Sequence, residues 1–349
     1  MSDAGTAALL ARIRADGPLT LAQFMADALL HPAWGYYATR DPLGRDFVTA
    51  PEISQTFGEL VGLALAQAWL DQGAPSPVTL AELGPGRGTL MADVLRATAR
   101  VPGLHAALSV HLVEASPTLR AVQRETLAGW SLTHHDRVET LPPGPVLLVA
   151  NEFLDALPIR QWRRAGAGWS ETLVGAEGGR LAPVAGAPMP VDALAHRMDE
   201  PEGTVVELCP ALPAVVGAVA ERVARGGAAV FVDYGHWRSR GDTLQAMRGG
   251  RPVNPFEAPG TADLTAHVDF EAVARAAPPA AASAMAAQGS WLERLGLTER
   301  TRALAARAEG PAREGLVAGH RRLTHPAEMG DLFKVLALTP RGASGVPGL

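Results

Sequence analysis

The stretch Val78–Leu90 constrains the fold of this chain more than any other. Its first part, Val78–Leu83, is largely apolar and rich in β-formers, which predicts a buried strand. Gly84-Pro-Gly-Arg-Gly88 follows and predicts a sharp turn, because glycine lacks the Cβ that blocks tight bends and close ligand approach. Apolar residues then recur at helical spacing from Leu90 to Leu95. A strand, a glycine turn and a helix within ~20 residues are typical of a nucleotide-binding α/β domain.

The spacing of the glycines indicates which ligand the turn binds. A dinucleotide site reads G-x-G-x-x-G and places a pyrophosphate on the helix N-terminus. Here the pattern is E-x-G-x-G-x-G, and the Glu82 carboxylate would repel a pyrophosphate but attract a cationic amine. S-adenosyl-L-methionine carries such an amine. We therefore predict that this cofactor is bound by Glu82 and by the turn residues Gly84, Pro85, Gly86 and Gly88. A turn that only tightens a strand–helix joint is the alternative.

Two further acids follow predicted strands. Glu114 ends the predicted strand Leu108–Val113, the position at which an acid binds ribose hydroxyls in doubly wound sheets. Its two carboxylate oxygens can accept both hydroxyls, so we predict that Glu114 binds the cofactor; a solvated surface glutamate is the alternative. Asp136 follows a short predicted strand, Leu132–His134, and is a second candidate for cofactor binding.

The acceptor side of the site is expected after the fourth predicted strand. Pro145–Ala150 is wholly apolar and leads into Asn151, Glu152 and Asp155. Ligands of doubly wound sheets bind beyond the carboxyl ends of the strands, so these three residues are the predicted catalytic residues. A helix cap is the alternative role for Asn151, and structural carboxylates are the alternative for the two acids.

Composition and charge exclude several classes of protein. The chain has 349 residues, 19% of them charged and 47% hydrophobic, as in a folded catalytic domain with additions. A formal charge of −5 does not indicate the basic surface that is typical of nucleic-acid-binding proteins. Cys209 is the single cysteine, so an intrachain disulfide or a cysteine metal site is excluded, and no metal is predicted. No apolar run reaches the ~18 residues of a membrane span. Asp3 and Asp16 argue against a targeting peptide, so we expect a cytoplasmic enzyme of bacterial type.

The chain divides into two predicted domains. Residues 1–75 are expected to form an N-terminal helical cap or lid, and residues 76–349 the catalytic domain. Within the latter we predict a β-hairpin insertion at about 160–204 and a covering segment at about 236–290, because both stretches are rich in glycine and proline.

Two capping boxes are expected in the N-terminal helices. Thr20 and Gln23 have the required spacing, as do Thr49 and Glu52. The second box is predicted to open a helix that buries an apolar face consisting of Phe57, Leu60, Val61, Leu65 and Trp69.

Several motifs together resemble one known family. They are Gly35-Tyr-Tyr37, Thr49-Ala-Pro-Glu-Ile-Ser54, Phe57-Gly-Glu59, Glu82-Leu-Gly-Pro-Gly-Arg-Gly-Thr89, Ala150-Asn-Glu-Phe-Leu-Asp-Ala-Leu-Pro158, Asp233-Tyr-Gly235, Asp263-Leu-Thr-Ala-His-Val-Asp-Phe270, Gln288-Gly289 and Met329-Gly-Asp-Leu-Phe-Lys334. They span nearly the whole chain. The sequence resembles the MidA-like S-adenosylmethionine methyltransferases, whose mitochondrial members are arginine methyltransferases that assist assembly of respiratory complex I.

The resemblance implies a fold, an activity and a partner. The fold is α/β, a Rossmann-like class I methyltransferase with a seven-stranded, mostly parallel sheet. The implied activity is protein arginine N-methylation related to complex I assembly, with the catalytic-core subunit of that complex as the protein substrate. The chain departs from the family at Leu43-Gly-Arg-Asp-Phe47, a shorter loop that carries Arg45, which leaves the acceptor-side conformation of this loop open.

Arginine methylation explains why two acids are needed. Guanidinium has a pKa above ~12 and its nitrogens are poor nucleophiles. Carboxylates can hold its planar fork bidentately and present one nitrogen to the methyl group. Glu152 and Asp155, three residues apart, are the best candidates for this role.

Other classes of function stay open at this point. One is a methyltransferase acting on a small molecule or on another side chain, and another is a non-catalytic assembly factor that keeps the cofactor-binding fold. A nicotinamide dehydrogenase is disfavoured by the glycine spacing. The sequence does not determine the oligomeric state, for which a homodimer is one option.

Overall fold

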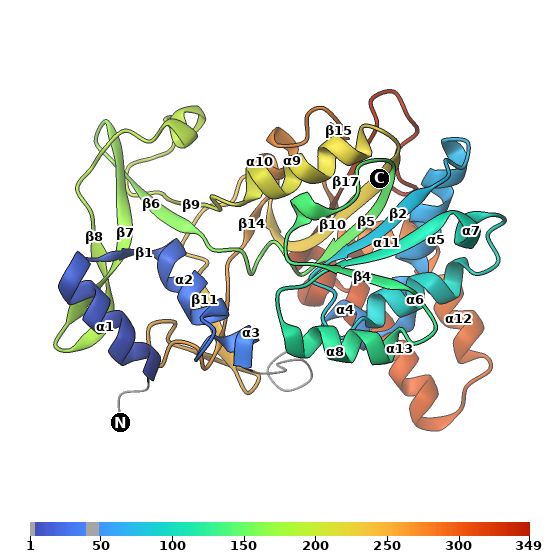
Figure 1. Cartoon of the computed structure of the whole chain (residues 1–349), viewed down its shortest axis with the longest axis horizontal. Coiled ribbons are helices and arrows are strands. Elements are labelled where there is room, and N and C mark those ends of the chain that lie inside the picture. The colour runs from blue at the N-terminus through green and yellow to red at the C-terminus, as the bar shows by residue number, and fades with distance from the viewer. Residues whose placement is uncertain (1–3, 40–48) are drawn as a thin grey trace. The chain divides into compact units, whose positions relative to one another are not determined.

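The computed structural model describes residues 4–39 and 49–349, and the chain forms two compact units. The central-sheet unit consists of Val48–Leu154, Pro213–Trp237 and Phe270–Leu349. The N-terminal unit consists of Met1–Phe47, Asp155–Leu212 and Arg238–Asp269. Both are shown in Figure 1 and are described separately below.

The central-sheet unit is built on a mixed sheet with the strand order β15-β17-β10-β5-β2-β3-β4. The pairings from β10 through β5, β2 and β3 to β4 are parallel, whereas β17 is antiparallel to β10. The short strands β15 and β16 both pair with β17. These strands are β2 (Val78–Leu83), β3 (Leu108–Val113), β4 (Leu132–His135), β5 (Val146–Asn151), β10 (Gly227–His236), β15 (Ala281–Ala282), β16 (Ala286–Ala287) and β17 (Phe333–Thr339). The predicted α/β class is confirmed.

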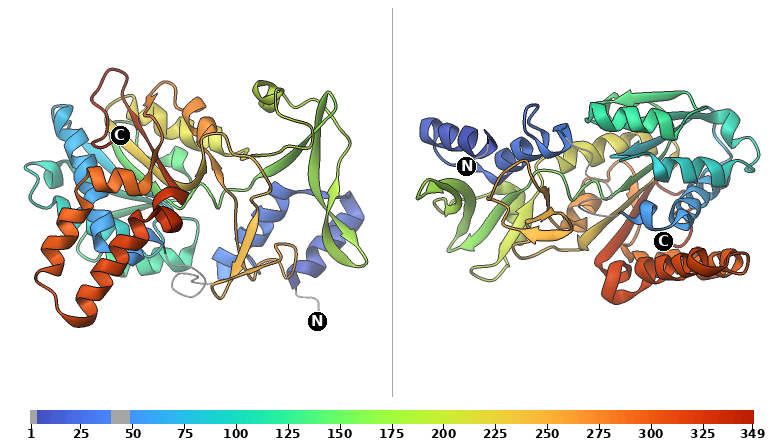
Figure 2. Two further views of the ribbon diagram at one scale, coloured as in Figure 1. Left: turned by 180° about the vertical axis from the view of Figure 1, so that it is seen from behind. Right: turned by 90° about the horizontal axis from the view of Figure 1, so that it is seen from below.

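Helices lie on both faces of this sheet, as Figures 1 and 2 show. Such layering is expected of parallel strands, because crossover connections place helices over the sheet. The helices are α4 (Ala50–Ile53), α5 (Gln55–Asp71), α6 (Thr89–Thr98), α7 (Leu104–Ala107), α8 (Pro117–Thr126), η1 (Val138–Thr140), α9 (Leu212–Val223), α10 (Phe270–Arg275), α11 (Gln288–Arg294), α12 (Leu297–Ala305), α13 (Gly310–Thr324) and η3 (Pro326–Gly330).

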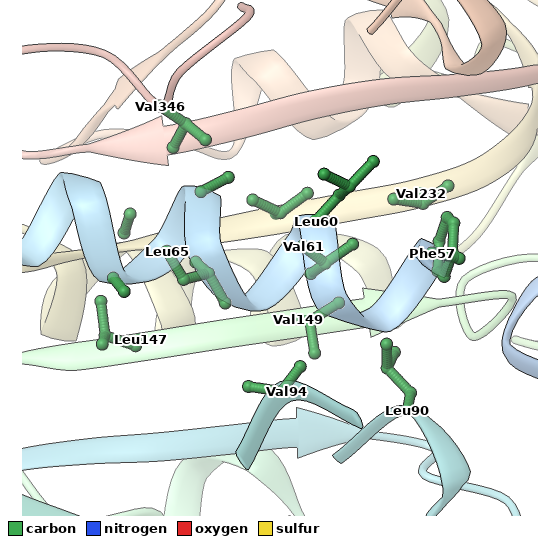
Figure 3. Packing of buried hydrophobic residues seen from close by; sticks show 14 of the residues in the cluster. Phe57, Leu60, Val61, Leu65, Leu90, Val94, Leu147, Val149, Val232 and Val346 are labelled. Atoms are coloured by element: carbon green, nitrogen blue, oxygen red, sulfur yellow. The ribbon is translucent and has the colours of Figure 1, made fainter. Parts of the chain in front are cut away.

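Helix α5 is central to the core of this unit. Figure 3 shows Phe57, Val61 and Leu65 of α5 facing Val149 of β5 and Val232 of β10. These five side chains are at most 1% exposed. Full burial of one such side chain contributes about 1.5–3 kcal/mol, so α5 is part of the folded sheet unit.

The start of α5 differs from the sequence prediction. The predicted box at Thr49 is wrong, because the Thr49 side chain makes no capping bond and only the short helix α4 follows it. Ser54, with an extended backbone, breaks the helix and caps α5 by accepting a hydrogen bond from the Thr56 N–H. The predicted box at Thr20 is confirmed by reciprocal bonds with Gln23.

The N-terminal unit contains two antiparallel sheets. One has the order β1-β7-β6-β9 with β8 paired to β7, and the other has the order β12-β11-β13. The strands of this unit are β1 (Leu19–Thr20), β6 (Arg160–Ala165), β7 (Gly168–Glu177), β8 (Arg180–Ala185), β9 (Val205–Leu208), β11 (Gln245–Arg248), β12 (Arg251–Val253), β13 (Asp263–Thr265) and β14 (Val268–Asp269). Its helices are α1 (Ala4–Asp16), α2 (Leu21–Leu30), α3 (Tyr36–Thr39) and η2 (Asp192–Arg197).

The hairpin β6–β7 lies within the segment 160–204 where a β-hairpin insertion is predicted. Contacts group residues 1–47 with this segment, whereas the sequence prediction separates residues 1–75 from the rest. A folding boundary near residue 75 stays a prediction. The loop Leu43–Phe47, with Arg45, lies outside the described residues. Within the described ranges no helix is long and apolar enough to cross a membrane.

Candidate active site

The glycine turn after β2 has the backbone conformation that its sequence requires. Gly84, Gly86 and Gly88 have φ values of +63°, +52° and +83°, all in the left-handed region that favours glycine. A Cβ on Gly84 would lie 2.8 Å from the Phe153 ring. The turn is closed by the Gly88 N–H, which donates to the Pro85 carbonyl at 2.7 Å, and α6 begins directly after it.

Glu82 is a buried carboxylate just before this turn. It is 3% exposed, and burial raises its pKa to about 8, with a further upward contribution from Glu114 and an opposing bond from the Met91 backbone. Its Oε2 atom is buried and has no hydrogen-bond partner among the described residues. An unsatisfied buried acceptor is costly unless a ligand supplies a donor. Glu82 therefore fits the cationic amine of S-adenosyl-L-methionine.

Glu114 follows β3 on the same edge of the sheet, where hydrogen bonds hold its carboxylate. Oε1 accepts from the Ser116 N–H at 2.8 Å, and Oε2 accepts from Gln123 Nε2 at 3.3 Å. Burial raises its pKa, while the bonds from Ser116 and Gln123 oppose that rise. The backbone of Ala115 adds a further bond that lowers the pKa, and the remaining acceptor capacity of the carboxylate is open to ligand hydroxyls.

Asp136 lies on the outer side of this region. Its side chain is 82% exposed and accepts a bond from Arg120 Nη2 at 2.5 Å. The same guanidinium donates to the Glu114 carbonyl. The structure thus connects Asp136 to Glu114 through Arg120, and direct cofactor binding by Asp136 stays a prediction.

Asn151 and Glu152 lie together at the carboxyl end of β5. Glu152 Oε1 accepts from the Ala50 N–H at 3.0 Å and from Asn151 Nδ2 at 3.1 Å. Glu152 has φ of +51°, a conformation that costs a non-glycine residue on the order of 1–3 kcal/mol. The Glu152 N–H donates to the Val232 carbonyl at 2.9 Å, which helps to hold this backbone. Asn151 Oδ1 is buried and makes no hydrogen bond within the described ranges.

Asp233 fixes the chain that follows Glu152, and sequence reasoning did not identify it as a site residue. It is 1% exposed, and its Oδ2 accepts from the N–H groups of Phe153 at 3.2 Å and Leu154 at 2.9 Å. It lies in β10, which is parallel to β5, so both segments reach the same edge. An acid at the end of the fifth predicted strand was the available signal.

Helix α4 also reaches this edge. Thr89 Oγ1 donates to Glu52 Oε1 at 2.6 Å, which connects α4 to the start of α6, and Ala50 N–H bonds to Glu152 as described. The motif Thr49–Ser54 therefore lies beside the predicted site.

Asp155 lies in the N-terminal unit, grouped there with Tyr37 and Asp263. Its side chain is buried, and its carbonyl accepts from the Ala266 N–H at 3.0 Å. The Tyr37 hydroxyl donates to Asp263 Oδ1 at 2.7 Å. Burial, then Asp263 and Asp155, raise the pKa of Tyr37. A fork formed by Glu152 and Asp155 stays a prediction.

The site residues of the central-sheet unit lie along one edge of its sheet. Glu114, Glu82, Asn151 and Asp233 lie at or near the carboxyl ends of the neighbouring parallel strands β3, β2, β5 and β10, respectively. Ligands of open α/β sheets bind at this edge. This edge thus carries the carboxylates of Glu82 and Glu114 and, on β5, the Asn151 amide bonded to the Glu152 carboxylate.

Comparisons with known proteins identify relatives of this chain. The sequence pattern of Methyltransf_28, an S-adenosyl-L-methionine-dependent methyltransferase family, matches residues 60–288. The protein arginine methyltransferase NDUFAF7 of Mus musculus is 36% identical over 368 residues, covering 95% of this chain and 83% of the mouse protein. The NDUFAF7 homolog of Drosophila melanogaster is 36% identical over 367 residues, covering 95% of this chain and 84% of that protein.

A solved structure resembles the whole chain. It is the crystal structure of a COG1565 superfamily member from Burkholderia thailandensis bound to S-adenosyl-homocysteine. The two superpose with a TM-score of 0.83 at 32% identity, covering 99% of this chain and 94% of the other.

Proposed function

The chain belongs to the Methyltransf_28 family of S-adenosyl-L-methionine-dependent methyltransferases, and from this premise we propose that its methyl acceptor is an arginine side chain of a protein. The observation that carries the proposal is the match to relatives named protein arginine methyltransferases over 95% of the chain. The Glu152 carboxylate at the acceptor end of β5 is chemically suited to such a substrate.

The proposed fold is the class I methyltransferase arrangement with a seven-stranded, mostly parallel sheet. Its support is the run of parallel pairings from β10 to β4 with one antiparallel neighbour, β17. The proposed cofactor residues are Glu82 for the amine, the turn Gly84–Gly88 for close backbone approach, and Glu114 for the ribose hydroxyls. Asp136 belongs to the same proposal.

When bound, the cofactor supplies an electrophilic methyl group on a sulfonium. The residues of this chain then have to align the acceptor for an in-line displacement, since alignment provides much of the acceleration of such a reaction. Glu152 is held in one orientation by Ala50 and Asn151, so its negative charge is fixed before a guanidinium arrives. Asn151 supports Glu152, and Asp155 is the proposed second carboxylate of the fork.

The proposed partner is a protein, and by the resemblance described above the expected target is the catalytic-core subunit of respiratory complex I. A cytoplasmic location belongs to the same proposal. The oligomeric state stays open.

Labelling of a lysate tests the proposed acceptor. The purified chain is incubated with methyl-labelled S-adenosyl-L-methionine and lysate from cells that lack it, and labelled proteins are hydrolysed for amino-acid analysis. We expect label in methylarginine, found in one or a few proteins, and none with a Gly86→Val variant. Label confined to small molecules or other side chains would replace arginine as the acceptor, and absence of any label would favour a non-catalytic role.

A further inference from the structure

Helix α8 carries a buried amide side chain, that of Gln123, which bonds to residues of the proposed cofactor site. Gln123 is 0% exposed, although it lies on a helix whose neighbouring residues Arg124, Glu125 and Thr126 are exposed. Burying an amide is unfavourable unless its hydrogen bonds are made. An apolar side chain of similar size would fill this space without that requirement, so the presence of an amide calls for an explanation.

The amide bonds to three different segments of the sheet edge. Gln123 Nε2 donates to the Gly86 carbonyl at 2.7 Å and to Glu114 Oε2 at 3.3 Å. Gln123 Oε1 lies 2.9 Å from His134 Nε2. These partners belong to the glycine turn after β2, to the end of β3 and to β4.

The orientation of the amide follows from the chemistry of its partners. A carbonyl oxygen and an ionised carboxylate can only accept, so the NH₂ group of Gln123 must face Gly86 and Glu114. Its oxygen then faces His134, which must carry its proton on Nε2. Burial, followed by Arg124 and Arg120, lowers the pKa of His134, which favours the neutral ring. One planar group therefore fixes both the glycine turn and the carboxylate next to it.

We propose that Gln123 is a positioning residue for the cofactor, because its amide holds the Gly86 carbonyl and the Glu114 carboxylate in one arrangement that receives the ribose. The inference rests on the cofactor residues proposed above. Ser116 bonds to Oε1 of Glu114 and Gln123 bonds to Oε2, so the carboxylate is held in one orientation, in which its remaining acceptor positions can receive the ribose hydroxyls. Without Gln123 the carboxylate can rotate and the turn loses one of its anchors.

The test compares the binding of two ligands by calorimetry. They are S-adenosyl-L-homocysteine and its 2′,3′-dideoxy analogue, which lacks the hydroxyls that Glu114 is proposed to bind. The ratio of the two affinities measures recognition of the hydroxyls. The variants are Gln123→Met, which removes the donors and keeps the length, Gln123→Glu, which keeps the size, and Glu114→Gln. Glu125→Met, exposed on the same helix, is the matched control, and thermal unfolding verifies that each variant is folded.

We expect both Gln123 variants to bind S-adenosyl-L-homocysteine about 10- to 100-fold more weakly than the unmodified chain. The affinity ratio should fall by about threefold or more, toward that of Glu114→Gln, because the two residues act as a unit. Glu125→Met should change neither quantity.

A purely structural role for Gln123 predicts a different result. General loosening would weaken both ligands by the same factor and leave the ratio unchanged, and that outcome in a folded variant overturns the inference, as does unchanged affinity for both ligands. If Glu114→Gln itself keeps the original ratio, the assignment of the ribose to Glu114 fails, and the inference about Gln123 fails with it.

Discussion

At the scale of single residues, Glu82 combines burial with an unsatisfied oxygen atom. Its pKa is raised to about 8, so at neutral pH this carboxyl is mostly protonated before a cofactor binds. A cationic amine favours the ionised carboxylate, and binding therefore releases that proton. The same residue thus sets both the charge of the site and its pH dependence.

We predict that cofactor affinity rises with pH between about 6 and 8, because only ionised Glu82 pairs with the cationic amine. Calorimetry in buffers of different ionisation enthalpy should detect proton release on binding near pH 7. Glu82→Gln should bind more weakly and lose this release. Affinity that is independent of pH between 6 and 8.5, with no proton exchanged, would contradict the role of Glu82.

The raised pKa of Glu82 also predicts how the free energy of unfolding depends on pH when no ligand is bound. Its pKa in the folded state, about 8, lies above the value of 4.5 expected when exposed. Folding therefore favours the protonated form, and the contribution of Glu82 to stability is full below pH ~4.5 and is lost as pH rises through about 8. The free energy of unfolding should fall over this window, and Glu82→Gln should flatten the decline. An identical pH profile for both proteins would refute this linkage.

At the scale of elements, the segment made of β2, the glycine turn and α6 is the proposed main binding site for the cofactor. Gly86→Val should abolish cofactor binding, because a branched side chain would occupy the space for the ligand and disfavour the φ of +52°. The measurement is calorimetric affinity together with the melting temperature.

Gly73→Val is the matched control for this substitution. Gly73 follows α5 with φ of +81°, and a Cβ there would meet nothing within 4 Å. The backbone strain, about 1–2 kcal/mol, is thus similar, but no ligand space is lost. We expect lower stability with unchanged affinity. Equal loss of affinity in both variants would mean that strain, and not the proposed ligand contact, explains the Gly86 result.

Local patterns were sufficient to predict these elements. The order of strand, glycine turn and helix can be seen within one short stretch. Glu82 was predicted from its place in that stretch, and Glu114 from its place after the next strand. The contacts made by Asp233, Ala50 and Gln123 join segments far apart in the sequence, so no local period encodes them. A local pattern can also mislead: Thr49 and Glu52 have the spacing of a capping box, but the Thr49 side chain makes no capping bond.

At the scale of the whole molecule, the prediction divides the chain once, at residue 75, whereas each unit of the structure combines several separate segments. The prediction placed α5 in an N-terminal cap on the basis of sequence order. In the structure α5 belongs to the core of the central-sheet unit, and residues 155–212 group with the N-terminal helices. A chain that leaves and re-enters a unit has no marker of composition at each crossing, so sequence order does not show this grouping. The predicted boundary near residue 75 stays a prediction.

A chain that begins at residue 75 should bind cofactor poorly, and the structure supplies a reason. The deletion removes Phe57, Val61 and Leu65 from the core, where each contributes about 1.5–3 kcal/mol. Their sum approaches the total stability of a typical domain, about 5–15 kcal/mol. Circular dichroism melting and calorimetry are the measurements, with a chain starting at residue 4 as control. Full binding by the shorter chain would show that the cap is dispensable.

The central claim is that Glu152 acts on an arginine acceptor while the cofactor is bound elsewhere on the same sheet edge. The most direct measurement is the initial rate of methylarginine formation by Glu152→Gln, made alongside its affinity for S-adenosyl-L-homocysteine, with the exposed Glu125→Gln as control. The account predicts a rate lower by ~10²- to 10³-fold, as for loss of one transition-state electrostatic contact, with little change in affinity. Asp155→Asn should behave alike if the two carboxylates form a fork. A Glu152→Gln rate equal to that of the unmodified chain, or a loss of rate fully matched by a loss of cofactor affinity, would contradict the account.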